Sequence, residues 1–189
     1  MPNYRRIIFL DEENTRLSPL TAALFKKKMW QAGVEGLGVS SRGRVVLFPE
    51  PVNQKIGEVA KMEYHIDLSS YTAREITETD FSAQTLVLTM DNATKVKTYE
   101  QFTSAANVFT LKEFLGSSGD LKLPLGGTVD EYKTVMDIVS GLLDNLVRKL
   151  FADEEKAKEF LDIFLNTPFS EGENHIRRIG KLERSRSEQ

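Results

Sequence analysis

Two hydrophobic periodicities alternate along the first 150 residues of this chain, and the alternation limits its fold more than any other feature. Short apolar runs of strand length are separated by stretches whose apolar residues recur every three or four positions, as on one face of a helix. The runs that predict strands are residues 6–10, 37–41 or 45–48, 85–90 and 107–111. Strands that alternate with helices form βαβ units and a parallel sheet. We therefore predict an α/β fold of three layers, with a central, mostly parallel four-stranded sheet between helices.

The helical stretches differ in strength. The first combines apolar residues at helical spacing with a run of lysines on the exposed side, and two weaker helices are predicted at 49–63 and 91–101. The strongest pattern near the C-terminal end consists of Tyr132, Val135, Met136, Val139, Leu142, Leu143, Leu146 and Leu150. A stripe of this length predicts a long helix that packs against the sheet.

The composition changes after residue 150, which divides the chain into three parts. Residues 1–150 form the predicted α/β domain, and residues 151–168 a helical extension. The apolar stripe of this extension consists of Phe160, Leu161, Phe164 and Leu165. Residues 169–189 are polar, and we expect a mobile tail there. Because an apolar stripe must be buried somewhere, the extension packs on its own domain or forms a dimer contact.

The composition excludes several kinds of protein. The chain has no cysteine and two histidines, so disulfides, thiol catalysis, thiolate zinc sites and histidine-rich metal sites are all excluded. A net charge of −3 gives no reason to expect binding to nucleic acid or an anionic membrane. No apolar run approaches the length of a transmembrane helix, and the N-terminus leads directly into a strand without the features of a signal peptide. We expect a cytoplasmic protein without a cofactor.

The segment between the first strand and the first helix has an unusual charge. Ser18 and Pro19 predict a helix start, with Ser18 as the N-cap. A short loop in front of a helix presents unpaired backbone N–H groups, which favour an anion. Yet this loop contains Asp11, Glu12 and Glu13. The negative charge therefore stands where an anion would bind.

Several segments resemble one known family. The segment IIFLDEENTRLSPLTAALFKKK is similar to the opening of low-molecular-weight protein tyrosine phosphatases, in which a strand runs into a C-x5-R-S-P loop and a helix. YHIDLSSYTAREIT resembles the family's G-I-D-x-S-x-H-x-A-R-x-L-T stretch, and LPLGGTVDEYKTVMDIVSGLLDNLV resembles its D-P-x-G-G segment and last helix. The resemblance covers about residues 5 to 150 and implies the family's α/β fold.

The resemblance also places the family's chemical residues, and all three differ here. Its nucleophilic cysteine falls on Asp11, its phosphate-binding arginine on Leu17, and its general-acid aspartate on Leu123. The loop that would bind phosphate becomes a degenerate anion loop of Asp11, Glu12, Glu13, Asn14, Thr15, Arg16, Leu17 and Ser18. A leucine cannot hold phosphoryl oxygens as a guanidinium does. We therefore expect no catalytic residues: an inactive homologue, or pseudophosphatase, that is not an enzyme and acts as a binding or regulatory module.

The carboxylate of Asp11 offers an explanation for the charge of the loop. Loop amides and the helix dipole can stabilise it as the resident anion of the site. A phosphate beside it meets repulsion of about 4 kcal/mol per pair of unit charges at about 4 Å and an effective dielectric constant near 20. The helix dipole returns only about 0.3–1 kcal/mol. Phosphate binding is thus disfavoured, unless Arg16 turns inward to offset the repulsion.

Other functions stay open on the sequence alone. Asp11 could act as a nucleophile, although the second aspartate that such enzymes carry two positions later is Glu13 here. Asp11, Glu12 and Glu13 could bind a divalent cation, or the altered cavity could bind a small ligand. The sequence names no partner: we expect an unknown protein or small molecule, no nucleic acid and no membrane, with a homodimer through residues 151–168 as an open alternative.

Overall fold

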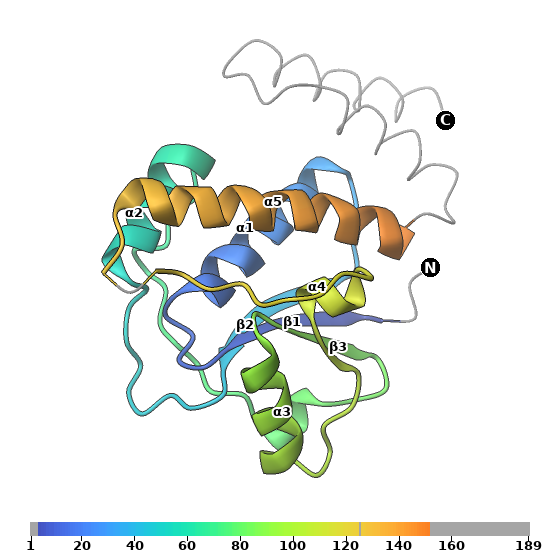
Figure 1. Ribbon diagram of the computed structural model, residues 1–189. Coiled ribbons are helices and arrows are strands. Elements are labelled where there is room, and N and C mark those ends of the chain that lie inside the picture. The colour runs from blue at the N-terminus through green and yellow to red at the C-terminus, as the bar shows by residue number, and fades with distance from the viewer. Residues whose placement is uncertain (1–3, 125, 152–189) are drawn as a thin grey trace, which may run out of the picture.

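The computed structural model describes residues 4–124 and 126–151, which form a four-stranded sheet covered by helices (Figure 1). The strands are β1 (Arg6–Asp11), β2 (Gly38–Gly43), β3 (Thr85–Thr89) and β4 (Val108–Thr110). Their order is β2-β1-β3-β4, and each neighbouring pair is parallel. The predicted α/β fold with a parallel four-stranded sheet is confirmed.

The helices lie on both faces of this sheet (Figure 1). They are α1 (Leu17–Gln31), α2 (Gln54–Tyr64), α3 (Asn92–Gln101), α4 (Leu111–Phe114) and α5 (Val129–Phe151), with a 3-10 turn at Glu78–Asp80. Helices α1, α2 and α5 pack against one another over one face, and α3 lies on the other. The three predicted layers are therefore present.

Strand β1 lies in the centre of the sheet and contributes to both layers of core. Ile7 and Phe9 belong to the apolar cluster under α1 and α5, whereas Ile8 and Leu10 belong to the cluster on the opposite face. All four side chains are fully buried. Because a strand that is covered on both faces needs no polar alternation, its sequence reads as a continuous apolar run. This run ends at Asp11, and the position of β1 thereby fixes where the acidic loop begins.

The structure decides between the two strand alternatives near β2 and corrects the start of the next helix. Of the two alternatives, the strand forms at 38–43, and residues 45–48 are a loop. The backbone N–H groups of Arg44 and Val45 donate to the carbonyl oxygens of Asp11 and Glu12, so the chain turns across the acidic loop instead of extending the sheet. The next helix, α2, begins at Gln54 and not at residue 49, because its N-cap is Asn53, whose side chain accepts from the N–H of Lys55.

The predicted extension at 151–168 and the polar tail at 169–189 lie outside the described residues, apart from Phe151 at the end of α5. Among residues 4–124 and 126–151, no helix is long and apolar enough to cross a membrane.

Candidate functional site

The acidic loop lines a cavity of about 280 Å³ at the carboxyl edge of the sheet. Backbone bonds from Met90 N to Leu10 O and from Leu121 N to Met90 O bring the 121–124 segment to the same edge. The cavity is lined by Asp11, Glu12, Glu13, Thr15, Arg16, Leu17, Met90, Asp91, Leu121, Lys122 and Leu123. Leu123, which is far from Asp11 and Leu17 in the sequence, therefore lines the same cavity as they do.

The carboxylate of Asp11 is held inside the loop by two backbone N–H groups. Its Oδ1 accepts from the N–H of Asn14 at 2.6 Å, and its Oδ2 accepts from the N–H of Ser18 at 2.9 Å. Only 9% of the residue is exposed. Both carboxylate oxygens thus use N–H groups that would otherwise point into the loop.

The start of α1 differs from the prediction that Ser18 is its N-cap. The helix begins at Leu17, and its N-cap residue Arg16 makes no side-chain capping bond. An N–H group in the first turn of a helix has no partner within the helix and needs one elsewhere. The N–H of Ser18 finds that partner in Asp11, seven residues earlier in the chain. The Asp11 carboxylate therefore takes the place of a local cap.

Asn14 connects the loop to the rest of the molecule and is fully buried. Its backbone has a positive φ of 59°, which asparagine tolerates better than most residues. Its Nδ2 donates to Ser18 Oγ at 2.8 Å, and its Oδ1 accepts from the N–H of Arg74 at 3.0 Å and from the Tyr71 hydroxyl. The Tyr71 hydroxyl also bonds to Ser41 Oγ at 2.8 Å. The sequence analysis did not identify Ser41, Tyr71 or Arg74 as supports of the loop, because each is distant from the loop in the sequence.

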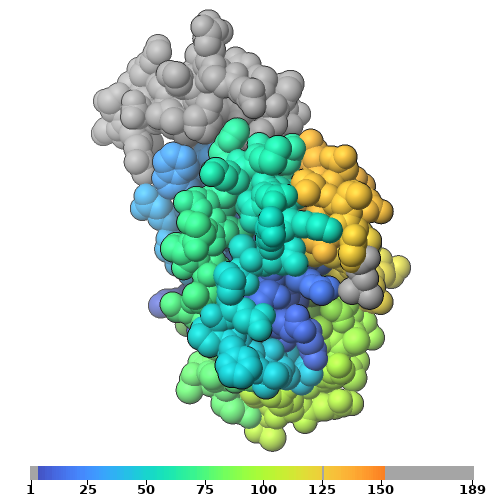
Figure 2. All heavy atoms as spheres, turned by 90° about the vertical axis from the view of Figure 1, so that its left-hand side faces the viewer, coloured from blue at the N-terminus to red at the C-terminus, as the bar shows by residue number. Residues whose placement is uncertain are grey.

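The loop also packs tightly on the end of β2. A Cβ added at Gly43 would lie 2.8 Å from the carbonyl carbon of Glu13 and 3.0 Å from the nitrogen of Asn14. Such distances leave no room for a side chain, so glycine allows the two backbones to approach. Figure 2 shows the result on the surface: the blue atoms of the loop region lie between the cyan segment after β2 and the orange start of α5.

Two opposing effects act on the pKa of Asp11. Burial raises it, because a carboxylate loses its hydration in the interior, while the bonds from Ser18 and Asn14 lower it. Burial is the larger effect, so the pKa lies above its ordinary value. The carboxylate is well matched to its two donors but poorly solvated.

Glu12 and Glu13 do not share this environment. Glu12 forms an ion pair with Arg44, whose Nε lies 2.9 Å from Oε2, and Lys97 Nζ lies 3.5 Å from Oε1. The hydrogen bond from Arg44 lowers the pKa of Glu12. Glu13 is exposed. Within the described residues, no group of three or more histidine, cysteine, aspartate or glutamate side chains is placed to hold a metal ion.

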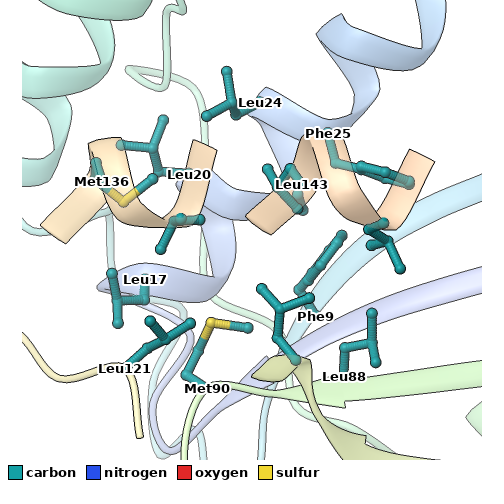
Figure 3. Packing of buried hydrophobic residues seen from close by; sticks show 14 of the residues in the cluster. Phe9, Leu17, Leu20, Leu24, Phe25, Leu88, Met90, Leu121, Met136 and Leu143 are labelled. Carbon is teal, nitrogen blue, oxygen red and sulfur yellow. The ribbon is translucent and has the colours of Figure 1, made fainter. Parts of the chain in front are cut away.

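One wall of the cavity is apolar. Leu17, Met90 and Leu121 point toward one another between α1 and the end of β3, and each is at most 5% exposed (Figure 3). Leu123 is partly buried beside them. Hydrocarbon side chains offer no donor to a phosphoryl oxygen. The cationic lining residues are Arg16 and Lys122, and the latter pairs with Asp120 at 3.1 Å.

Residues 6–157 match the sequence profile of the family described as low molecular weight phosphotyrosine protein phosphatase. The chain belongs to this family. A protein-arginine-phosphatase from Bacillus subtilis (strain 168) is 37% identical over 151 residues, which cover 78% of this chain and 97% of the relative.

Solved structures agree with this assignment. A low molecular weight protein tyrosine phosphatase from T. tengcongensis superposes with a TM-score of 0.71 at 33% identity, covering 77% of this chain and 99% of that one. A serine variant of an arginine phosphatase, with its active-site serine phosphorylated, gives a TM-score of 0.69 at 34% identity and covers 80% and 99%.

These relatives correct one expectation. From the residues of the loop we expected that the chain is not an enzyme. The relatives contradict this expectation. The relatives that match almost over their whole length are named phosphatases, and the phosphorylated serine in one structure marks a reacting site. The chain is therefore placed in a family of phosphatase enzymes.

Proposed function

We propose that this member of the phosphatase family acts as a binding or regulatory module, in which the Asp11 carboxylate fills the anion loop. On this proposal, Asp11, Leu17 and Leu123 occupy the positions of the family's cysteine, arginine and general-acid aspartate. The observation that carries the proposal is the pair of hydrogen bonds from Asn14 and Ser18 to the two oxygens of Asp11. The cavity then receives a segment of a partner protein, and its anion site is already filled.

Two further features support a filled anion site. The chain contains no cysteine, so no thiolate can attack phosphorus from this loop. Leu17 packs against Met90 and Leu121, in contrast to a guanidinium that would reach toward phosphoryl oxygens (Figure 3). A phosphate would therefore have to displace Asp11 from its donors without a bidentate partner of its own.

Thermal unfolding with phosphate or orthovanadate tests this function. A ligand that binds only the folded state adds about 2.7 kcal/mol at a concentration one hundred times its dissociation constant. We expect no rise in the Tm of the wild-type protein, because Asp11 already occupies the donors. Asp11→Ser removes the charge and leaves room, so a rise should appear in the variant. Equal stabilisation of both proteins would overturn the proposal and make Arg16 the first cation to test.

A second candidate is phosphoryl transfer through Asp11. The observation that favours it is the related structure whose active-site serine carries a phosphoryl group. In that protein of the same fold, a side-chain oxygen is bonded to phosphorus. In this reaction an Asp11 oxygen forms a bond to phosphorus while the bond to the leaving group breaks. Water then hydrolyses the acyl phosphate, releasing phosphate and restoring the carboxylate.

Hydrolysis assays separate the two candidates. Purified protein is incubated with p-nitrophenyl phosphate and with a phosphoarginine peptide, each with and without magnesium. Turnover that is lost in Asp11→Asn but retained in Asp91→Asn, which alters another carboxylate of the same cavity, would establish the second candidate. We expect no turnover that depends on Asp11, because both of its oxygens are held by loop N–H groups.

A further inference from the structure

Asp11 is a buried carboxylate whose hydrogen-bond donors are all neutral. The residue is 9% exposed, and its donors are the backbone N–H groups of Asn14 and Ser18. Among the described residues, no lysine, arginine or histidine forms an ion pair with it. Buried carboxylates are usually paired with a cation. Because Asp11 lines a cavity, a cation from outside the chain can reach it.

The cavity carries an excess of negative charge. Besides Glu12, which pairs with Arg44, three carboxylates line it, and none of them forms an ion pair with another described residue. These three are Asp11, Glu13 and Asp91. The lining cations are Arg16 and Lys122, of which Lys122 is balanced by Asp120. Three carboxylates against the one remaining guanidinium leave an excess of two negative charges.

The rest of the wall is hydrocarbon. Leu17, Met90 and Leu121 form it together with Leu123 (Figure 3). The volume of about 280 Å³ is below the roughly 300–1,000 Å³ of pockets for drug-sized ligands, so it suits a single side chain. An apolar wall beside a buried carboxylate matches an aliphatic stem that ends in a cation, as in arginine and lysine.

The geometry of the carboxylate favours arginine over lysine. A carboxylate offers about four acceptor positions on its two oxygens, and Asp11 uses one on each oxygen for a loop N–H. The remaining positions suit the planar fork of a guanidinium. The same loop already holds one guanidinium in this manner: Arg44 Nε donates to Glu12 Oε2 at 2.9 Å, and Nη2 donates to Oε1.

We propose that the cavity binds an unmodified arginine side chain of a partner protein, with its guanidinium at Asp11 and its stem along the wall of Leu17, Met90, Leu121 and Leu123. This inference rests on the binding function proposed above and gives its partner a chemistry. The excess negative charge attracts a basic segment and repels a phosphorylated one. A loop whose N–H groups favour an anion thus receives a cation, because Asp11 supplies the anion itself.

Titration of the full-length, ¹⁵N-labelled protein with three peptides tests the proposal. Each probe is an acetylated and amidated pentapeptide of alanines with arginine, lysine or citrulline in the centre. Citrulline keeps the shape of arginine without its charge. We expect the amide signals of Asn14 and Ser18 to shift with the arginine peptide, at a Kd at least tenfold below that of the citrulline peptide. The lysine peptide should lie between the two, because an ammonium lacks the fork.

Three variants locate the binding. Glu13→Gln removes an exposed carboxylate of the cavity and should raise the Kd of the arginine peptide about threefold. Glu35→Gln removes the same charge between α1 and β2, away from the lining residues, and should bind as the wild type does. Leu123→Lys places an ammonium inside the cavity as a competitor and should raise the Kd at least tenfold. Tm values close to that of the wild type would show that each variant is folded.

Two results would overturn the inference. One is equal affinity for the arginine and citrulline peptides, and the other is an equal loss of affinity in Glu13→Gln and Glu35→Gln. If these results occur while phosphate still leaves the Tm of the wild type unchanged, the choice of arginine is wrong and the filled anion loop stands. Stabilisation of the wild type by phosphate would instead overturn the proposed function and this inference together.

Discussion

Two neighbouring segments at the carboxyl edge of the sheet differ in which side chains they bury. The 11–18 loop buries polar groups: Asn14 and Ser18 are fully buried, and Asp11 is nearly so. The 44–52 segment lies across this loop but exposes Leu47 and Phe48, at 81% and 69%. Two backbone bonds join the two segments, from the N–H groups of Arg44 and Val45 to the carbonyl oxygens of Asp11 and Glu12, so both belong to one folded unit.

The difference in burial indicates how much each segment contributes to stability. The buried loop satisfies its polar groups internally, and its order depends on those bonds, because an unsatisfied buried group costs free energy. The outer segment leaves Leu47 and Phe48 exposed to solvent. Stability should therefore depend strongly on the first segment and hardly at all on the second.

Among substitutions in these two segments, Asn14→Ala should have the largest effect. It removes the acceptor for the Arg74 N–H and the Tyr71 hydroxyl, the donor to Ser18, and a residue type suited to φ 59°. We expect a loss of about 3 kcal/mol in the free energy of unfolding, measured by urea denaturation. Asn92→Ala is the matched control, because Asn92 is exposed and its bond to Asp120 comes from the backbone. Similar losses in both variants would contradict the comparison.

Asp11→Asn should have the second largest effect, about 1–2 kcal/mol at neutral pH. An asparagine offers one acceptor oxygen where the loop supplies two N–H donors, from Asn14 and Ser18. The sign of the pH dependence is distinctive. Burial raises the pKa of Asp11 in the folded state. The protonated side chain therefore adds to the free energy of unfolding of the wild type at low pH. This contribution is lost as pH rises from the unfolded pKa through the raised folded pKa.

The variant lacks this titrating group. The stability difference between wild type and Asp11→Asn should therefore shrink as pH rises through that window. Urea denaturation at a series of pH values measures it, and a difference that grows with pH would show that the hydrogen bonds outweigh burial.

Glu12→Gln should cost less, about 0.2–1 kcal/mol, because the ion pair with Arg44 is formed by a side chain that is 42% exposed. The pKa of Glu12 is lowered in the folded state, so its contribution is present above the unfolded pKa and disappears as pH falls through the folded value. Thermal melts in low and high salt provide the check, since a screened surface pair should contribute less at high salt. A cost unaffected by salt would indicate that Glu12 supports the loop by packing.

Phe48→Ala should have the smallest effect, within about 0.5 kcal/mol, because the ring contributes little to the interior. Phe25→Ala provides the contrast, since Phe25 is fully buried and its truncation should cost about 3–5 kcal/mol. Chemical denaturation of the two variants side by side measures the difference. A comparable loss in Phe48→Ala would mean that the 44–52 segment is packed and not displayed.

Much of the fold was predictable because β1 and α5 carry strong patterns. A strand buried on both faces, such as Ile7 to Leu10, reads as an apolar run, and the stripe around Met136 and Leu143 reads as a long helix. Residues 45–48 were ambiguous because an exposed apolar loop has the same composition as a strand. Backbone bonds to the acidic loop decided between the two, and these depend on contacts across the chain.

The site was less predictable than the fold. The acidic residues and the anion loop are visible in the sequence, but the helix start at Leu17 depends on Asp11 reaching Ser18, which local capping preferences do not anticipate. Tyr71 and Arg74 support Asn14 from 57 and 60 residues away, and no spacing rule connects them. The expectation that the chain is not an enzyme was drawn from three positions, and the relatives' names contradict it.

The long sequence separation of the Asn14 contacts also sets an order of events in folding. The bonds to Arg74 and Tyr71 form only when the 71–74 segment has closed a long chain loop onto Asn14, which carries an entropic cost. The anion loop should therefore be completed after the rate-limiting step. Contacts made late affect mainly the unfolding rate, so we expect Asn14→Ala to accelerate unfolding in stopped-flow experiments while leaving the refolding rate almost unchanged. The acidic loop then contributes to kinetic stability: it slows unfolding of the native state without changing the rate of folding.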